Sequence, residues 1–345
     1  MNKVTIKDIA SHANVSIATV SRTIATPDKV SLATRKIVND AIKDLGYYPS
    51  IIAQGMHKKI NNIGVVLNRN TEDSFFSPYL SEVLRGLVKA AKELGYFIQI
   101  LTCERDIKGC IELISLYRSR RVDGYILLSS KIEDIFIQTL VNESIPFILH
   151  GNNKDKNYTD KVYSIDIDNI AAAKDLVKYL LELGHRNIAM INSSTDYLYN
   201  QERFWGYQQA LIDYQRTVNP EIVYESSENP DIAAGEIRSF LMKNPEVTAV
   251  VCKSDISARQ LIQIANEIGL HVPNDLSVVC FNATYAATMA DPKLTTISIP
   301  IYQIGLELLK SMVDILNNQP VKIRQIFPYA VIIGSSCQKL INKQN

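Results

Sequence analysis

Residues 5–24 read TIKDIASHANVSIATVSRTI, and this stretch decides the fold of the N-terminal region. Thr5 is a good helix N-cap, and Asp8 three residues later nearly completes a capping box and puts a negative charge in the first turn. Asn14 tolerates the left-handed backbone of a tight turn, and Ser16 can cap the helix that follows. The stretch therefore predicts two short helices joined by a turn, a helix-turn-helix.

A third helix is expected from about residue 31, with one apolar face formed by Ile37, Val38, Ala41, Ile42 and Leu45. Gly46 follows, where a glycine commonly ends a helix. The second helix exposes Ile17, Ala18, Ser21 and Arg22. This is the face that a recognition helix presents to the major groove of DNA.

The charge distribution also favours double-stranded DNA as the partner. Residues 1–60 carry nine Lys and Arg against four Asp, a net charge of +5, whereas the whole chain is +1 and the remainder is therefore −4. A basic head on a slightly acidic body suits a protein that meets phosphate at one end only. A plain three-helix domain with a solvated basic face is the alternative, but the run VSxxTVSR at residues 15–22 is much more specific than that.

Composition limits the remaining possibilities. A chain of 345 residues that is 46% hydrophobic is expected to form two or three globular domains. No stretch approaches the roughly 18 apolar residues of a membrane span, and the N-terminus lacks a signal peptide, so we expect a cytoplasmic protein with no membrane partner. Five scattered cysteines and five histidines without ligand spacing predict neither disulfides nor a metal site. No cofactor loop or nucleophile motif appears, so an enzyme is not expected.

Beyond the head, Pro49 ends the helical pattern, and residues 50–59 read either as a helix that forms only when docked or as a plain linker. Strands then alternate with helices, as in a doubly wound parallel sheet. The first strands are expected at 63–67, 96–101, 122–128 and 146–149, and the helices at 80–94, 107–118 and 132–142. Strands at 187–192, 247–251 and 276–281 repeat the pattern, so a second lobe and a ligand-binding cleft are predicted.

With head, hinge and two lobes in this order, the chain resembles the lactose-repressor (LacI) family of bacterial transcription regulators over essentially its whole length. The matching stretches are residues 5–22, 50–53, 75–77, 121–124, 168–169, 183–189, 203–211, 272–279 and 292–296. The resemblance implies an all-α helix-turn-helix head at 1–48 and a hinge helix or linker at 49–61. A two-lobed α/β domain with parallel sheets, like a periplasmic binding protein, is implied at 62–338, and a tail at 339–345.

The resemblance also implies the DNA contacts. Ile17, Ala18 and Arg22 would read bases, because arginine can fork onto guanine and apolar side chains suit thymine methyls. Phosphate contacts would come from Thr5, Ser16, Thr19 and Ser21. The hinge segment would fold on the operator and enter the minor groove, with contacts from Ser50, Ala53, Gln54, Met56 and Lys58. Met56 takes the place of the family's usual leucine wedge, and Gln54 that of its usual arginine.

In the cleft, the resemblance implies an effector site formed by Phe75, Phe76, Arg203, Trp205, Ser254, Asp255 and Asn282. The two phenylalanines resemble aromatics that stack on a sugar ring, with core packing as the alternative. Asn282 replaces an aspartate of the family pattern, and Gly151 follows the fourth strand where an aspartate is usual. Fewer carboxylates suit a neutral sugar, and this pattern resembles the maltose/α-glucoside repressors. At Asp166 and Asp168 we expect only a helix cap, formed by Asp168 or Asn169. At His185-Arg186 we expect a helix-to-strand turn where basic residues meet the helix C-terminus.

The sequence thus predicts a repressor that binds a pseudo-palindromic operator and is relieved by a small neutral sugar, best maltose or a related α-glucoside. Only eight residues follow Cys337, too few for a coiled-coil tetramerisation helix, so a homodimer is expected. One alternative is a global catabolite regulator with a phosphocarrier protein or phosphosugar as corepressor. A free sugar-binding receptor is another, disfavoured by the basic head and the missing signal peptide.

Overall fold

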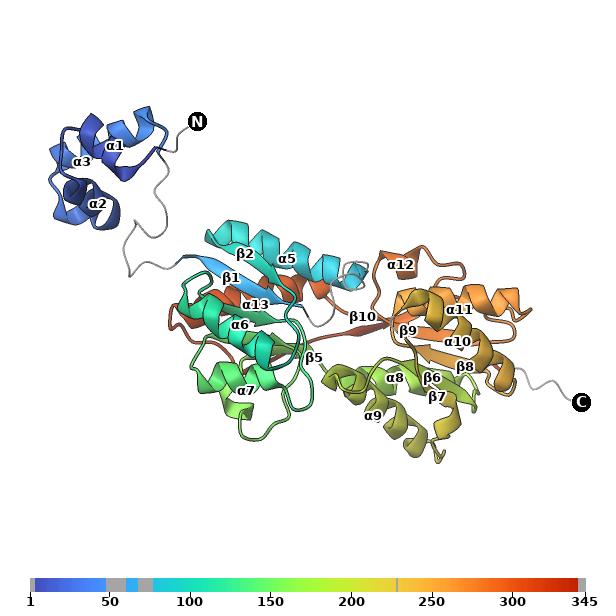
Figure 1. Cartoon of the computed structure of the whole chain (residues 1–345). Coiled ribbons are helices and arrows are strands. Elements are labelled where there is room, and N and C mark those ends of the chain that lie inside the picture. The colour runs from blue at the N-terminus through green and yellow to red at the C-terminus, as the bar shows by residue number, and fades with distance from the viewer. Residues whose placement is uncertain (1–3, 48–59, 68–76, 228, 341–345) are drawn as a thin grey trace, which may run out of the picture. The chain divides into compact units, whose positions relative to one another are not determined.

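The computed structural model describes residues 4–47, 60–67, 77–227 and 229–340 (Figure 1). The chain divides into two compact units, a head at Met1–Ile60 and a body at Asn61–Asn345, and each is described by itself. The hinge residues expected to touch DNA, Ser50, Ala53, Gln54, Met56 and Lys58, lie outside the described residues, and so do Phe75 and Phe76.

The head consists of three helices, α1 (Ile6–His12), α2 (Ile17–Ala25) and α3 (Leu32–Asp44), with a 3-10 turn η1 (Pro27–Lys29) before the last. Their buried core is formed by Ile9, Ala10, Ala13, Val20, Val38 and Ala41. The predicted helix-turn-helix is therefore confirmed. The prediction that Ile37 joins the buried face of α3 is wrong, because this side chain is 50% exposed.

The residues expected to cap the helices of the head and to form its turns do so in the structure. The Asp8 carboxylate accepts hydrogen bonds of 2.7 Å from both the backbone N–H and the hydroxyl of Thr5. Ser16 Oγ accepts from Thr19 N at 3.0 Å and so caps α2. Asn14 and Gly46 adopt left-handed φ values of 48° and 60° after α1 and α3. Asn14 thus forms the turn between α1 and α2, and Gly46 ends α3.

The first lobe of the body is a six-stranded parallel sheet in the order β11-β5-β4-β3-β1-β2. Its strands are β1 (Asn62–Val66), β2 (Phe97–Leu101), β3 (Gly124–Leu127), β4 (Phe147–His150), β5 (Ser164–Ile167) and β11 (Arg324–Phe327). Helices α5 (Pro78–Leu94) and α13 (Ile301–Leu316) pack on one face, and α6 (Ile107–Arg118) and α7 (Ile135–Asn142) on the other. A 3-10 turn η3 (Thr159–Lys161) precedes β5.

The second lobe is a sheet in the order β12-β10-β9-β8-β6-β7, parallel except for the β10–β12 pair. Its strands are β6 (Ile188–Asn192), β7 (Val223–Glu225), β8 (Ala249–Cys252), β9 (Ser277–Phe281), β10 (Thr295–Ser298) and β12 (Ala330–Ile332). One face packs against α8 (Asn169–Glu182) and α9 (Leu198–Asp213), the other against α10 (Pro230–Lys243) and α11 (Asp255–Glu267). The short η4 (Pro220–Ile222) and α12 (Tyr285–Thr288) complete it.

The chain passes between the lobes three times, each time through one or two residues. The crossings lie between β5 and α8, between β10 and α13, and between β11 and β12. Short parallel crossings of this kind form a common hinge, and the carboxyl ends of strands from both sheets face each other beside it. Among the described residues, no helix is both long and apolar enough to cross a membrane.

Candidate functional site: the cavity between the lobes and the exposed face of α2

A cavity of about 560 Å³ lies between the two lobes, beside the crossings. The first lobe contributes the start of α5 and the residues that end β4 and β5. The second lobe contributes the start of α8 and α11, one side of α9, and the residues after β6, β7, β8 and β9. The volume lies in the range of sites that enclose a small molecule.

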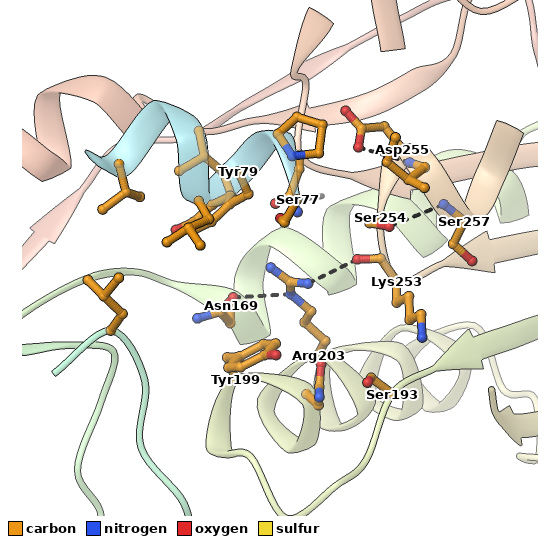
Figure 2. Close-up of a pocket in the computed structure, with 18 of the residues that line it drawn as sticks. Ser77, Tyr79, Asn169, Ser193, Tyr199, Arg203, Lys253, Ser254, Asp255 and Ser257 are labelled. Carbon is orange, nitrogen blue, oxygen red and sulfur yellow. Dashed lines mark hydrogen bonds between the residues drawn. The ribbon is translucent and has the colours of Figure 1, made fainter. Parts of the chain in front are cut away.

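Arg203 projects from α9 into this cavity (Figure 2). The residue is 7% exposed, and its guanidinium carbon lies 4.0 Å from the centroid of the Phe281 ring. Its Nε donates to Asn169 Oδ1 and one terminal nitrogen donates to the Lys253 carbonyl, both at 3.3 Å. Burial lowers the pKa of Arg203, while the neighbouring Tyr199, Tyr79, Asp166 and Glu202 act in the opposite direction. The guanidinium is therefore held in one orientation, with donors directed at the cavity.

Opposite Arg203, Tyr79 from α5 meets His150 at the end of β4. The Tyr79 hydroxyl lies 2.5 Å from His150 Nε2, and His150 Nδ1 lies 3.0 Å from the Ile165 carbonyl oxygen. A carbonyl only accepts, so Nδ1 carries the proton and Nε2 accepts from the tyrosine. Burial lowers the pKa of His150, which keeps this imidazole neutral. The pair forms a rigid, uncharged wall.

The carboxyl groups of Asp166 and Asp255 line the cavity, and their surroundings differ. Burial, with a smaller contribution from Glu202, raises the pKa of Asp166 to about 7. Asp255 is an internal anchor, because its oxygens accept from Thr284 N at 3.0 Å, Thr284 Oγ1 at 2.5 Å and Ile256 N at 2.9 Å. With Arg203 and Lys253 also in the lining, the cavity holds as many cationic as carboxyl side chains.

Three polar atoms in the lining are buried without a hydrogen-bond partner among the described residues. They are Asn200 Oδ1, Ser257 Oγ and Asn282 Oδ1. Leaving such a group unsatisfied costs about 1–3 kcal/mol. Neighbouring atoms shield all three from the cavity, so a ligand hydroxyl pairs with one of them only after its side chain turns toward the cavity. Ser254 is partly engaged, since its hydroxyl caps α11 by accepting from Ser257 N at 3.2 Å.

The predicted effector residues separate into three groups, of which the first, Phe75 and Phe76, lies outside the described residues. Arg203, Ser254, Asp255 and Asn282 all line the cavity. Trp205 does not, and its ring centroid instead lies 4.1 Å from Lys154 Nζ. A contact between Trp205 and an effector thus gains no support from the structure.

Sequence reasoning missed Tyr79, His150 and Asn169 as parts of the site. Their positions carried a usable signal, because His150 ends a strand and the other two start helices at the same edge of the lobes. The capping expectations are confirmed for Asp168 and Arg186. Asp168 accepts from Ala171 N at 2.9 Å at the start of α8, and Arg186 donates to the Leu181 carbonyl in the last turn of that helix at 3.1 Å. His185 does not cap a helix, because it bonds to Thr248 and to the Gln338 carbonyl. Backbone bonding to the second lobe continues to Leu340, whose N–H donates to Leu183 O at 2.8 Å.

On the head, Ile17, Ala18 and Arg22 are exposed on α2, and Ser21 is half-buried beside them. The hydroxyls of Ser16 and Thr19 lie 2.8 Å apart, and this bond uses only one of their two protons. The other proton is free to donate to a phosphate. Thr5 differs, because its N–H and its hydroxyl both donate to Asp8, so a phosphate contact would displace that carboxylate.

Within the described ranges, no group of three or more His, Cys, Asp or Glu residues could hold a metal ion.

Residues 5–50 match the family "Bacterial regulatory proteins, lacI family", and residues 177–337 match "Periplasmic binding protein-like domain". The chain is 32% identical to the HTH-type transcriptional regulator RegA of Clostridium saccharobutylicum, over 91% of this chain and 93% of RegA. The chain belongs to the LacI family.

A second LacI-family relative, the HTH-type transcriptional repressor CytR of Escherichia coli K12, is 32% identical over 92% of this chain and 91% of CytR. A solved complex of the transcriptional regulator CelR with cellobiose superposes with a TM-score of 0.74 at 28% identity. That match covers 97% of this chain and all of CelR. These relatives are transcription regulators, and the head and the two-lobed body described above make this chain a LacI-family regulator of transcription.

Proposed function

We propose that the protein is a homodimeric repressor of sugar-utilisation genes, relieved by a neutral sugar, with maltose or a related α-glucoside as the first candidate. The observation that carries this proposal is the fixed guanidinium of Arg203 in a cavity that the hydroxyl and amide side chains of Ser254, Ser257 and Asn282 also line. A sugar offers a ring of hydroxyl donors and acceptors and no net charge, and both cationic and carboxyl side chains line the cavity. Its relative CelR was solved with a disaccharide, cellobiose.

For the DNA side, we propose that α2 lies in the major groove of each half-site of a pseudo-palindromic operator. Arg22 would bind guanine O6 and N7, and Ile17 with Ala18 would contact thymine methyls. Ser16, Thr19, Ser21 and Thr5 would contact phosphates, and Met56 would act as the minor-groove wedge. Such a protein acts on chromosomal DNA, so we place it in the cytoplasm.

The coupling between the two sites would use the three crossings as a hinge. A sugar that bridges Arg203 on one lobe and the Tyr79–His150 wall on the other binds the closed lobes better than the open ones. Closure would then change the dimer interface and release the operator. About 100-fold relief requires a coupling free energy of only about 3 kcal/mol.

The test is calorimetric titration of the full-length protein with maltose, cellobiose, ribose and glucose 6-phosphate. We expect a neutral sugar to bind. Arg203→Met should weaken that binding by ~10-fold or more, because charge-assisted hydrogen bonds contribute about 1.5–3 kcal/mol. Arg238→Met is the matched control, since Arg238 is an exposed α10 residue paired with Glu267 and distant from the lining. Binding of glucose 6-phosphate alone would refute the neutral-sugar proposal and favour a catabolite regulator.

A further inference from the structure

Outside the cavity, a buried carboxylate on α9 ties the second lobe to the first. Glu202 is 4% exposed. Its Oε1 accepts from Asn152 Nδ2 at 2.8 Å and lies 3.3 Å from Lys154 Nζ. Asn152 and Lys154 belong to the loop between β4 and β5 of the first lobe, so both interactions cross the lobe boundary. A carboxylate buried to this degree is stable only with such partners.

A second set of interlobe contacts lies next to Glu202. Ile132 N donates to Asp196 O at 3.2 Å, and Leu198 N donates to Ser130 O at 3.1 Å, which joins the loop after β3 to the loop before α9. Ser130 Oγ also donates to Asn152 O at 2.5 Å. The two first-lobe loops therefore hold the start of α9 as one unit.

Glu202 also reaches the effector cavity through Asn169. Its Oε2 accepts from Asn169 Nδ2 at 3.5 Å, and Asn169 Oδ1 accepts from Arg203 Nε at 3.3 Å. Asn169 and Arg203 line the cavity, whereas Glu202 does not (Figure 2). One carboxylate thus contacts the partners that hold the lobes together and the amide that orients the guanidinium.

The chain's single tryptophan lies at the same contact. Lys154 Nζ is 4.1 Å from the Trp205 ring centroid, a cation–π geometry, while the same ammonium pairs with Glu202. Trp205 is half-buried in this position. Any separation of the lobes removes Lys154 from the indole, so Trp205 is a built-in reporter of this contact.

We propose that Glu202, with Asn152 and Lys154, forms an interlobe latch, and that Glu202 is a positioning residue for the effector site. It acts through Asn169 on Arg203 and favours the closed lobes that retain the ligand. This inference rests on the proposed effector function for its consequence, whereas the latch itself rests on the contacts of Glu202 with Asn152 and Lys154. Opening the lobes would strip Glu202 of both first-lobe partners and hydrate it, which is the conformational change that the latch opposes.

The experiment compares full-length wild type with Glu202→Gln and Lys154→Met, and uses Lys156→Met in the same loop as the control. Glu202→Gln is nearly isosteric and removes the charge, and Lys154→Met removes the cation while keeping an apolar chain over the indole. Acrylamide quenching of Trp205 is measured without ligand. We expect the quenching constant to rise roughly 1.5-fold or more in both latch variants, because the open population grows, and to stay unchanged in Lys156→Met. Unchanged quenching in Glu202→Gln would overturn the latch.

The same proteins are then titrated with maltose in a stopped-flow experiment. We expect Glu202→Gln to bind ~10-fold more weakly through faster dissociation, with the association rate unchanged, as lost closure requires. Equal dissociation rates in wild type and Glu202→Gln would overturn the positioning role. A purely structural role for Glu202 would not raise the dissociation rate while leaving the association rate unchanged. If no sugar binds wild type, the proposed effector fails, whereas the ligand-free quenching result still decides on the latch.

Discussion

Gly206 on α9 provides the most quantitative prediction. An added Cβ at this position would lie 2.2 Å from the Ile170 carbonyl oxygen and 2.7 Å from Ala173 Cβ, both on α8. Neither atom can move by side-chain rotation, so the two helices must separate. Overpacking of this kind costs about 1–3 kcal/mol, with this site at the upper end, whereas Gly→Ala inside a helix gains about 1 kcal/mol of propensity. The clash dominates, and Gly206→Ala should lose roughly 2 kcal/mol.

Gly235 on α10 supplies the matched control, because a Cβ there meets no atom within 4 Å. Gly235→Ala should therefore gain up to about 1 kcal/mol from helix propensity alone. Urea unfolding followed by circular dichroism measures the free energy of unfolding of both variants. In thermal unfolding, the Tm of Gly206→Ala should fall by roughly 4–8 °C. A Gly206→Ala protein as stable as wild type would refute the close approach of α8 and α9. Since Arg203 lies one turn earlier on α9, the same variant should also bind its effector more weakly.

Three further predictions concern single groups. Ser16→Ala removes the cap of α2, worth about 1 kcal/mol, so amide exchange in α2 should accelerate roughly 5-fold; unchanged exchange would contradict the cap. Tyr79→Phe leaves the buried His150 Nε2 without its donor, so urea unfolding should show a loss of about 1–3 kcal/mol, and full stability would argue against this bond. Burial raises the folded-state pKa of Asp166 to about 7, above its usual value of about 3.9. Between about pH 3.9 and 7 the folded protein retains this proton while the unfolded chain loses it, so the free energy of unfolding falls as the pH rises through that interval. Asp166→Asn cannot ionise and should lose less Tm than wild type between pH 5 and 7.5; an identical pH dependence would refute the assignment.

Local signals in the sequence predicted the head and the first lobe well. Thr5, Asn14, Ser16 and Gly46 act through neighbours three or four residues away, so their roles are readable from the sequence alone. The helix at 107–118 has the predicted bounds, and the strand order βαβα predicted the parallel sheet. Hydrophobic periodicity predicted these elements because each of them buries one face.

The misses depend on contacts between residues far apart in the chain. Hydrophobic periodicity predicts whether a segment is a helix or a strand, but it does not predict which sheet the segment joins. It therefore could not show that α13 and β11, which follow the second-lobe strands in the sequence, belong to the first lobe. Trp205 is expected at the effector because it lies two residues from Arg203, yet residues two apart on a helix point in different directions, and it does not line the cavity. Its contact with an effector stays a prediction. The hydrogen bond between Tyr79 and His150 joins residues 71 positions apart, so no local sequence pattern predicts it.

We propose that the protein binds an operator and releases it when a sugar fills the cavity. Fluorescence anisotropy tests it directly, with full-length protein titrated onto a labelled palindromic duplex from upstream of its own or a neighbouring gene, with and without maltose at fixed salt. We expect specific binding in the nanomolar range that weakens ~10-fold or more with maltose. Tight binding that no sugar alters would contradict the effector assignment, and absence of specific binding to every candidate duplex would contradict the repressor itself.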